Sequence, residues 1–452
     1  RKEWKIDMKT GIQLSDHFTY RKLLRFTGPS IIMMVFTSVY GVVDGFFVSN
    51  YAGKTAFAAI NLIMPFIMIL GGMGFMIGTG GTALVSLVLG QNDRAKANRY
   101  FSMMIYLSVI MGIVLSVLGF VFMRPVAGLL GATPEMMEDC VLYGRITIGF
   151  ITAFMLQNVF QSFLIAAERP KLGLAATVAA GLTNMVLDAL FVGVFRWGTA
   201  GAALATGVSQ CVGGVLPLLY FIRPNTSRLR LSRTKLEIRP LLQACANGSS
   251  ELMSNISASV VSMIYNFQLL KYLGENGVSA YGVLMYVQFI FVAIYIGYAV
   301  GAAPVISFHY GAENETELKN MFRKSMCLVG SASVVLTVLA FVLASPLARI
   351  FVGYDEELFV LTRHAFHLFA FSFLLAGFNI FTSSLFTALN NGAVSAAISF
   401  MRTLIFQTAS VLILPILFGV DGIWWAVTAA EVFACLLSTG FLVAKREKYR
   451  YL

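Results

Sequence analysis

The sequence contains little charge for its length, since 12% of its 452 residues are Asp, Glu, Lys or Arg, whereas 58% are hydrophobic. A water-soluble protein of this size needs a far more charged exterior, so the composition excludes the soluble class. Cysteine is also scarce, and the five cysteines form no CxxC motif, which excludes a disulfide framework and a cysteine-based metal site. The four histidines show no metal-ligand spacing either.

Long apolar runs fill most of the chain, and several approach the roughly 20 residues that cross a bilayer core. The hydrophilic breaks between them predict twelve membrane-spanning helices and therefore an all-α membrane protein. The predicted spans are 26–49, 57–85, 99–123, 141–163, 172–195, 199–222, 243–270, 279–305, 322–344, 359–386, 394–418 and 422–444. Glycine and proline inside several spans, such as Gly80 and Pro304, indicate close helix packing or bends.

The formal net charge is +11, but the basic residues occupy short breaks between apolar runs, so nucleic-acid binding is not expected. Most of them fall on one side of the predicted membrane protein. They are Arg1, Lys2, Lys5, Lys9, Arg21, Lys22, Arg25, Arg94, Lys96, Arg99, Arg169, Lys171, Arg223, Arg228, Arg230, Arg233, Lys235, Arg239, Lys319, Arg323, Lys324, Lys445, Arg446, Lys448 and Arg450. The positive-inside rule predicts a multi-pass protein of the plasma (inner) membrane with both termini in the cytoplasm.

The second half of the chain repeats the first at an offset of about 221 residues. Tyr51–Gly53 corresponds to Tyr272–Gly274, and Ser86–Gly90 corresponds to Ser307–Gly311. Because each copy holds six spans, both enter the membrane in the same orientation, which predicts two pseudo-symmetric six-helix bundles arranged as parallel repeats. The predicted parts are a cytoplasmic N-terminal segment (1–25), an N-terminal lobe (26–222), a cytoplasmic inter-lobe linker (223–240), a C-terminal lobe (241–444) and a cytoplasmic tail (445–452).

Ionisable residues inside the spans are few, and each costs about 2.5–3.5 kcal/mol to insert, so each is a functional candidate. Asp44 and Asp188 lie at similar depth, and Thr206 shares that depth on the next helix. Tyr40 and Asn184 lie one helical turn from the two aspartates, on the same helix faces. This oxygen-rich set predicts a site for a shared proton or a Na⁺ ion. Alternatively, each aspartate only forms local hydrogen bonds that fix helix packing.

Three further ionisable residues lie in spans of the second half. Glu251 and Arg402 fall near the predicted inner ends of their helices, close enough in depth for a structural ion pair; the alternative is that they reach the membrane interface. Glu431 lies deeper, where it could meet a cationic substrate.

At the repeat offset, all the charged candidates have uncharged counterparts. These correspondences are Asp44 with Tyr265, Asn184 with Ile405, Asp188 with Ala409, Thr206 with Val427, Glu251 with Ser30, Arg402 with Gly181, and Glu431 with Gln210.

Several short motifs are distributed along the chain. They are Gly28-Pro29, the stretch Tyr40 to Asp44 followed by Gly-Phe-Phe-Val, Gly90-Gln-Asn-Asp93, Asn184-Met-Val-Leu-Asp188 and Gly201-Ala-Ala-Leu-Ala-Thr206. With these motifs the chain resembles the multidrug and toxic compound extrusion (MATE) family over nearly its whole length. In the DinF-like branch of that family, helices one, five and six form the cation site. The resemblance carries those roles to Asp44, Asn184, Asp188 and Thr206, with Tyr40 as a neighbour.

A second branch of the family, the NorM-like one, relies on acids in the second lobe, including one in helix ten. The span 359–386 contains no Asp or Glu, so the resemblance favours the DinF-like branch. It implies a multidrug efflux antiporter that exchanges protons or Na⁺ for amphipathic, often cationic small molecules by rocker-switch alternating access. It also implies a cavity between the lobes, and Gln157, Gln161, Gln210 and Glu431 are candidate lining residues.

The resemblance requires no cofactor besides the coupling ion, and we expect a monomer in the lipid bilayer. An alternative in the same superfamily is a flippase of lipid-linked oligosaccharide precursors. Such a protein should have a strongly cationic cavity to hold a pyrophosphate, whereas the spans here carry few basic residues. An enzyme is not expected, because no catalytic constellation is found in the sequence.

Overall fold

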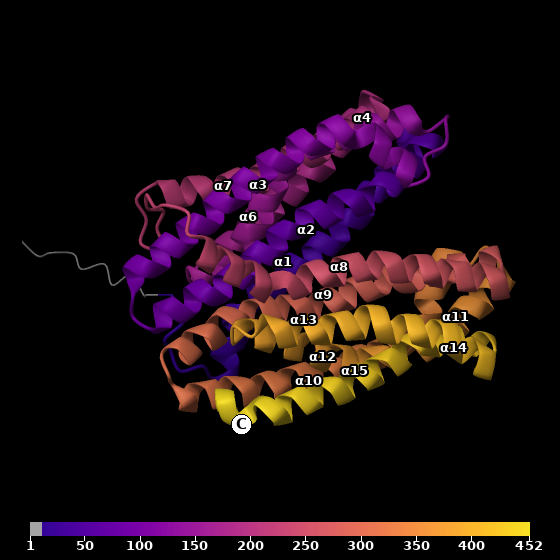
Figure 1. Ribbon diagram of the computed structural model, residues 1–452. Helices are drawn as coiled ribbons and strands as arrows, with labels where there is room; N and C mark the ends of the chain where they lie inside the picture. The colour runs from indigo at the N-terminus through magenta and orange to yellow at the C-terminus, as the bar shows by residue number, and fades with distance from the viewer. Residues whose placement is uncertain (1–10) are drawn as a thin grey trace, which may run out of the picture.

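The computed structural model describes residues 11–452; Arg1, Lys2, Lys5 and Lys9 of the predicted N-terminal segment lie outside the described residues. The described part is built from helices, which confirms the all-α prediction (Figure 1). The elements are α1 (Tyr20–Phe47), η1 (Val48–Ala52), α2 (Lys54–Gly90), α3 (Arg94–Leu129), α4 (Met137–Gly149), α5 (Ile151–Ala166), α6 (Pro170–Leu187), η2 (Asp188–Val194), α7 (Gly198–Ile222), α8 (Ile238–Leu273), α9 (Glu275–Gly311), α10 (Glu315–Val352), α11 (Glu356–Ala370), α12 (Ser372–Ala388), α13 (Gly392–Phe400), η3 (Met401–Phe406), α14 (Gln407–Phe418) and α15 (Val420–Tyr449), where η marks a π-helical segment.

Every predicted span corresponds to one helix or to consecutive helices. The span predicted at 141–163 is α4 and α5, which meet at 52°, and that at 359–386 is α11 and α12, which meet at 45°. Among the described residues, nine helices are long and apolar enough to cross a membrane, or up to eleven if each bent pair is one span. The remaining long helix, α8, has 36 residues and carries polar side chains such as Asn247, Ser250 and Glu251.

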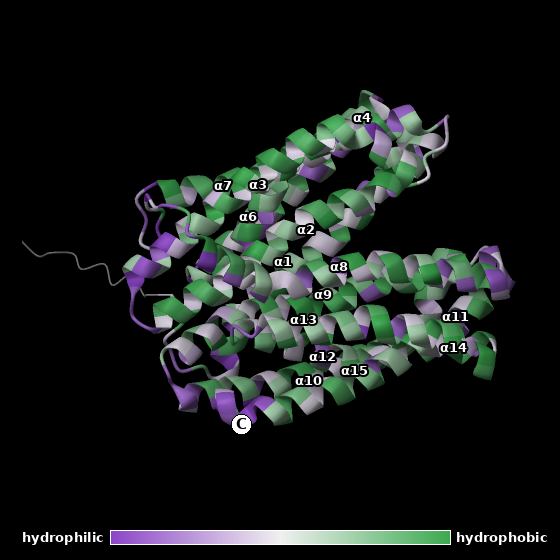
Figure 2. Ribbon diagram, in the orientation of Figure 1, coloured by the Kyte–Doolittle hydropathy of each residue, from purple (hydrophilic) through white to green (hydrophobic). Residues whose placement is uncertain are grey.

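The helices form two lobes, an N-terminal lobe of α1–α7 and a C-terminal lobe of α8–α15 (Figure 1). Hydrophobic residues dominate the middle of both lobes, and hydrophilic residues gather toward the helix ends (Figure 2). Between the lobes, α2 packs against α8 and α1 packs against α9. The ribbons of the two lobes lie together at the end that holds the C-terminus and diverge toward α4 and α11 (Figure 1).

Pairs of glycines bring the lobes together at the end where they meet, which we call the closed end. A Cβ atom on Gly90 would collide with the carbonyl oxygen of Phe308, and one on Gly311 would collide with that of Leu87. Gly90 and Gly311 are related by the repeat offset, and so are Leu87 and Phe308. The two contacts are therefore one contact repeated about the pseudo-symmetry axis, as parallel repeats require.

A second layer of glycine contacts at the closed end is also repeated between the lobes. Gly80 approaches the backbone of α8 at Gly248, and Gly301 approaches the backbone of α1 at Thr27. The repeat offset relates Gly80 to Gly301 and Thr27 to Gly248. Small residues at these positions let helix backbones approach closely, which is how membrane helices associate without a hydrophobic driving force. The scaffold of the closed end is thus symmetric between the lobes.

We predict that Gly311→Ala opens the closed end, because the added methyl group collides with backbone that cannot move aside alone. Overpacking of this kind costs about 1–3 kcal/mol. Spin labels on the first turns of α3 and α10 should report a longer distance in detergent, and thermal unfolding should begin at a lower temperature. Gly282→Ala in the same helix is the control, since a Cβ atom there has no neighbour within 4 Å. Equal distances and unfolding temperatures in both variants would contradict the proposed contact.

Candidate functional site

The N-terminal lobe brings two aspartates together inside the membrane. Asp44 lies near the end of α1, and Asp188 lies where α6 passes into the π-helical segment η2. The two carboxyl groups are close enough to share a hydrogen bond when one of them is protonated, and Asn184 of α6 is also within reach of Asp44. A π-helical turn widens the helix and changes the direction of its side chains, and such turns are frequent at functional sites. We call Asp44 and Asp188 the carboxylate pair.

The carboxylate pair has no positively charged partner among the described residues. Asp188 is fully buried, and neither of its carboxyl oxygens has a hydrogen-bond partner in the described part of the chain. The side-chain oxygen of Asn184 and one carboxyl oxygen of Asp44 are also unpartnered. Two adjacent carboxylates in a region of low dielectric repel each other unless a proton or a cation lies between them. The oxygen atoms of this site are therefore arranged to take up a small cation.

Two further side chains predicted for this site, Tyr40 and Thr206, lie on helices near the carboxylate pair. Tyr40 of α1 interacts with Gln157 of α5, and its ring packs over Gly181. Thr206 lies on α7, which packs against α6 and η2, although no hydrogen bond in the described residues joins its hydroxyl group to either aspartate. The sequence thus predicted Tyr40 and Asn184 as neighbours of the aspartates, while direct participation of Thr206 stays a prediction.

Tyr143 of α4 is a neighbour that the sequence analysis did not identify. It is buried, and the charges of Asp44 and Asp188 act on its hydroxyl group. Its only sequence signal was a tyrosine near the outer end of the fourth predicted span. Helical depth alone could not show that α4 turns this side chain toward the aspartates.

The three glutamines predicted to line a cavity are buried within the N-terminal lobe. Gln157, Gln161 and Gln210 are each 5–6% exposed. The side chain of Gln157 packs against Gly213, while the side-chain oxygens of Gln161 and Gln210 have no hydrogen-bond partner among the described residues. Their role in lining a substrate cavity stays a prediction.

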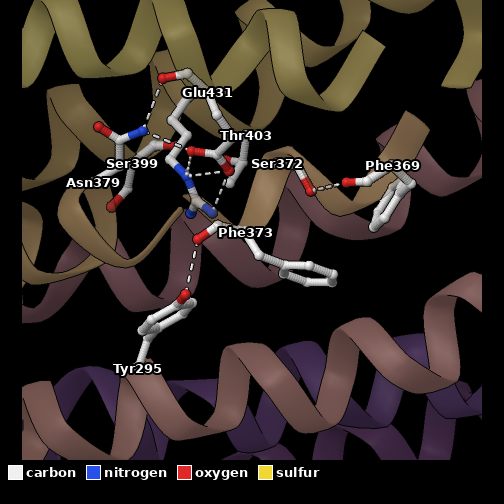
Figure 3. A network of polar contacts seen from close by, with 9 residues as sticks. Tyr295, Phe369, Ser372, Phe373, Asn379, Ser399, Thr403 and Glu431 are labelled. Carbon is white, nitrogen blue, oxygen red and sulfur yellow. Dashed lines mark hydrogen bonds and ion pairs between the residues drawn. The ribbon is translucent and has the colours of Figure 1, made fainter. Parts of the chain in front are cut away.

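The structure corrects the predicted pairing of Glu251 with Arg402. Arg402 instead pairs with Glu431 of α15, and Nη2 of Arg402 lies 2.7 Å from Oε1 of Glu431 (Figure 3). Depth along the helices favoured Glu251, but the side chain of Arg402 points from η3 toward Glu431 of the adjacent α15. The side chain of Glu431 is 2% exposed and paired with a basic side chain of the protein itself, and its predicted role in lining a cavity stays a prediction.

A short irregular segment, residues 11–19, which contains a turn between Gln13 and Asp16, crosses the closed end and contacts both lobes. The backbone N–H of Leu14 donates to the carboxylate of Glu168 in the N-terminal lobe (2.9 Å). The backbone N–H of Phe18 donates to the carboxylate of Glu317 in the C-terminal lobe (2.9 Å). Both apolar side chains are fully buried. We call residues 11–19 the N-terminal clasp, because its two ends are held by different lobes.

Further contacts hold the clasp on the side of the C-terminal lobe. Nδ1 of His17 lies 2.6 Å from Oε2 of Glu317. The carbonyl oxygen of Phe18 accepts hydrogen bonds from Nδ2 of Asn320 and Nζ of Lys324, both at 2.9 Å. These bonds satisfy the backbone of a segment that has no secondary structure of its own.

Glu168 holds the clasp on the side of the N-terminal lobe. It lies in the connection between α5 and α6, and Nε of Arg228 approaches its carboxylate at 3.3 Å. Burial raises the pKa of Glu168 above its usual value, and the N–H of Leu14 and the guanidinium of Arg228 oppose that shift. These partners favour the ionised carboxylate that accepts the bond from the clasp.

Comparisons with known proteins agree with the fold and the motifs. The multidrug export protein MepA of Staphylococcus haemolyticus (strain JCSC1435) is 24% identical over 433 residues, which cover 95% of this chain and 94% of MepA. A crystal structure of MATE in complex with MaL6 superposes with a TM-score of 0.91 at 20% identity, covering 98% of this chain and 100% of that one. A multidrug resistance MATE family transporter of the MOP superfamily, in an outward-facing conformation, also reaches a TM-score of 0.91 at 20% identity, over 98% of this chain and 99% of that one.

The two solved structures share the fold of this chain. The sequence itself matches the MatE family in both lobes, over residues 29–190 and 252–411, and each of these stretches covers most of one lobe. The chain therefore belongs to the MatE family.

Proposed function

We propose that this MatE transporter is a secondary active antiporter that exports amphipathic, often cationic small molecules in exchange for protons or Na⁺. The observation that carries the proposal is the carboxylate pair, in which Asp188 is buried and Asp44 partly buried, without a basic partner among the described residues. The similarity to MepA, a multidrug export protein, supports the substrate class. As a member of this family the chain is a transporter and not an enzyme.

The carboxylate pair takes up the coupling ion in this mechanism. A proton binds to one carboxyl group and is shared with the other, or Na⁺ binds between carboxylate and amide oxygens, the ligands that hard cations prefer. Asn184 supplies the amide oxygen, and Thr206 completes the set if the helices move closer. These residues match the cation site of the DinF-like branch, so we assign the chain to that branch.

The driving force for such an exchange is sufficient without ATP. One charge that moves inward across about 100 mV supplies about 2.3 kcal/mol. A tenfold chemical gradient of the ion adds about 1.4 kcal/mol. Together these energies sustain a substrate gradient of about a few hundredfold.

Alternating access requires the closed end to open while the other end closes. We place the closed end in the cytoplasm, with both termini, because the basic loops lie on that side. The glycine contacts between the lobes and the N-terminal clasp must then separate when the protein faces inward. A rocking motion of the two lobes about their shared interface requires no second copy of the chain, so a monomer in the plasma membrane is sufficient.

A flippase of lipid-linked oligosaccharides is less well supported. Its cavity would need free basic side chains for a pyrophosphate group. Arg402 is paired with Glu431 inside the C-terminal lobe, and Arg145 donates to the carbonyl oxygen of Phe120 within the N-terminal lobe. Neither arginine is available for an anionic substrate, which favours export of cationic or neutral molecules.

We predict that Asp44→Asn removes the dependence of efflux on the ion gradient, because the carboxylate pair loses one negative charge. A coupling free energy of 1–3 kcal/mol corresponds to an effect of about 5- to 150-fold on substrate affinity, and this effect should disappear. The measurement is efflux of a cationic dye from vesicles under proton and Na⁺ gradients imposed separately. Asp421→Asn is the control, because Asp421 is exposed at the start of α15. Gradient-driven efflux at the native rate in Asp44→Asn would rule out the proposed role.

We predict that Glu317→Gln weakens the N-terminal clasp and shifts the protein toward the state that is open at the clasp. Hydrogen bonds to a charged group contribute about 1.5–3 kcal/mol, and the amide forms weaker ones. The readout is the distance between spin labels on the two lobes at the closed end. Glu315→Gln is the matched control, since Glu315 lies two residues earlier in α10 and pairs with exposed Arg450 instead. If both variants keep the native distance distribution, the clasp does not stabilise the closed end.

A further inference from the structure

A second cluster of buried polar groups lies outside the carboxylate pair, in the C-terminal lobe (Figure 3). Nε of Arg402 lies 3.0 Å from each carboxyl oxygen of Glu431, and Nη2 lies 2.7 Å from Oε1. Nδ2 of Asn379, from α12, donates to Oε2 of Glu431 at 2.6 Å and to its backbone carbonyl at 3.0 Å. Both carboxylate oxygens are thus satisfied by donors of the protein itself.

The equivalent positions of the N-terminal lobe carry no charge. The repeat offset relates Asn379 to Asn158, and both asparagines are buried. It relates Glu431 to Gln210 and Arg402 to Gly181. The carboxylate pair of the N-terminal lobe thus lies at other positions of the repeat and has no basic partner in the described residues, whereas the acid of the C-terminal lobe has a basic partner on the adjacent helix.

Arg402 is the more exposed member of the pair. Its side chain is 14% exposed, against 2% for Glu431, so the guanidinium covers the carboxylate on its more accessible side. Arg402 follows directly on the start of η3, whose π-helical turn directs the side chain. A guanidinium stays charged at every pH that proteins experience, so the positive charge beside Glu431 is permanent.

Hydroxyl groups lead away from this pair toward the closed end. Thr403 donates to the carbonyl oxygen of Ser399, one turn earlier. A row of hydroxyl contacts then continues through Ser383, Ser395 and Thr387, at 2.8, 3.0 and 2.6 Å. Hydroxyl groups both donate and accept, so such a row can carry a proton or solvate a small cation. The row begins next to Arg402 in the sequence, while the positive charge beside Glu431 itself is supplied by the guanidinium.

We propose that Arg402 is a tethered counter-cation that occupies the cation position beside Glu431 and so prevents the C-terminal lobe from acting as a second coupling site. The inference rests on the proposed antiport. It assigns Arg402 as the residue that sets the number of ions exchanged per substrate. Each lobe then contributes differently: the N-terminal lobe binds an exchangeable cation, and the C-terminal lobe holds a permanent one.

The test measures the steady-state concentration ratio of a cationic dye across the membrane of proteoliposomes. A tenfold cation gradient is imposed, and the membrane potential is clamped at zero. We call the highest ratio reached the limit. Each additional ion exchanged per dye molecule multiplies that limit by about tenfold. We expect Arg402→Gln to raise the limit by about tenfold, because Glu431 then takes up an exchangeable cation. Arg145→Gln, which removes an arginine without a carboxylate partner, should keep the native limit. A folded, active Arg402→Gln variant with the native limit would overturn the proposal.

The double variant Arg402→Gln/Glu431→Gln keeps the proposal testable if Arg402→Gln does not fold, because it removes both charges and leaves no unpaired ion. We expect the native limit in this variant. A limit about tenfold lower would mean that Glu431 already exchanges a cation in the native protein, and the proposal would be wrong.

An independent measurement uses dicyclohexylcarbodiimide, which modifies protonated carboxyl groups in apolar surroundings, followed by peptide mapping. We expect no modification of Glu431 in the native protein, and modification in Arg402→Gln. Modification of Glu431 in the native protein would overturn the inference. A different result would contradict the proposed antiport, namely that efflux by the native protein responds to neither ion gradient. In that case the labelling of Glu431 still decides whether Arg402 shields this carboxylate.

Discussion

A carboxylate inside a membrane bundle must be compensated by a proton, a metal ion or a basic side chain, and this requirement governs the interior of both lobes. In the C-terminal lobe the compensation is permanent, because Arg402 binds both oxygens of Glu431. In the N-terminal lobe Asp44 and Asp188 have no basic partner within residues 11–452. An exchangeable cation fits only where compensation is missing, so the difference between the lobes is what gives one of them a place for a coupling ion.

The helix scaffold is far more symmetric between the two lobes than the charged residues inside it are. The contact of Gly90 with the backbone at Phe308 is repeated by Gly311 at Leu87, at the same offset that relates the two halves of the sequence. Such contacts depend on the absence of a side chain and are insensitive to charge. The duplicated halves therefore keep a common scaffold while the polar residues inside each lobe differ.

The sequence predicted the helices well and the directions of their side chains only in part. Hydropathy located a helix or consecutive helices for every predicted span, and the rise per residue placed Asp44 and Asp188 at one depth, because both quantities follow from local sequence. The azimuth of a side chain depends on how its helix packs, which explains why Arg402 was paired with Glu251 instead of Glu431 and why Tyr143 was missed. The bends between α4 and α5 and between α11 and α12 likewise depend on tertiary packing.

One helix connects the carboxylate pair with the contacts that close the opposite end. Glu168, which accepts the hydrogen bond from the N-terminal clasp, lies two residues before α6, and Asp188 lies directly after it. An α-helix of 18 residues is about 27 Å long and transmits a displacement along its axis with little deformation. A cation that draws Asp188 toward Asp44 therefore pulls on the same element that carries Glu168. Under the proposed antiport, ion binding near one end of the N-terminal lobe and release of the clasp at the other are linked by the stiffness of α6, and also by α1, which follows the clasp directly and carries Asp44.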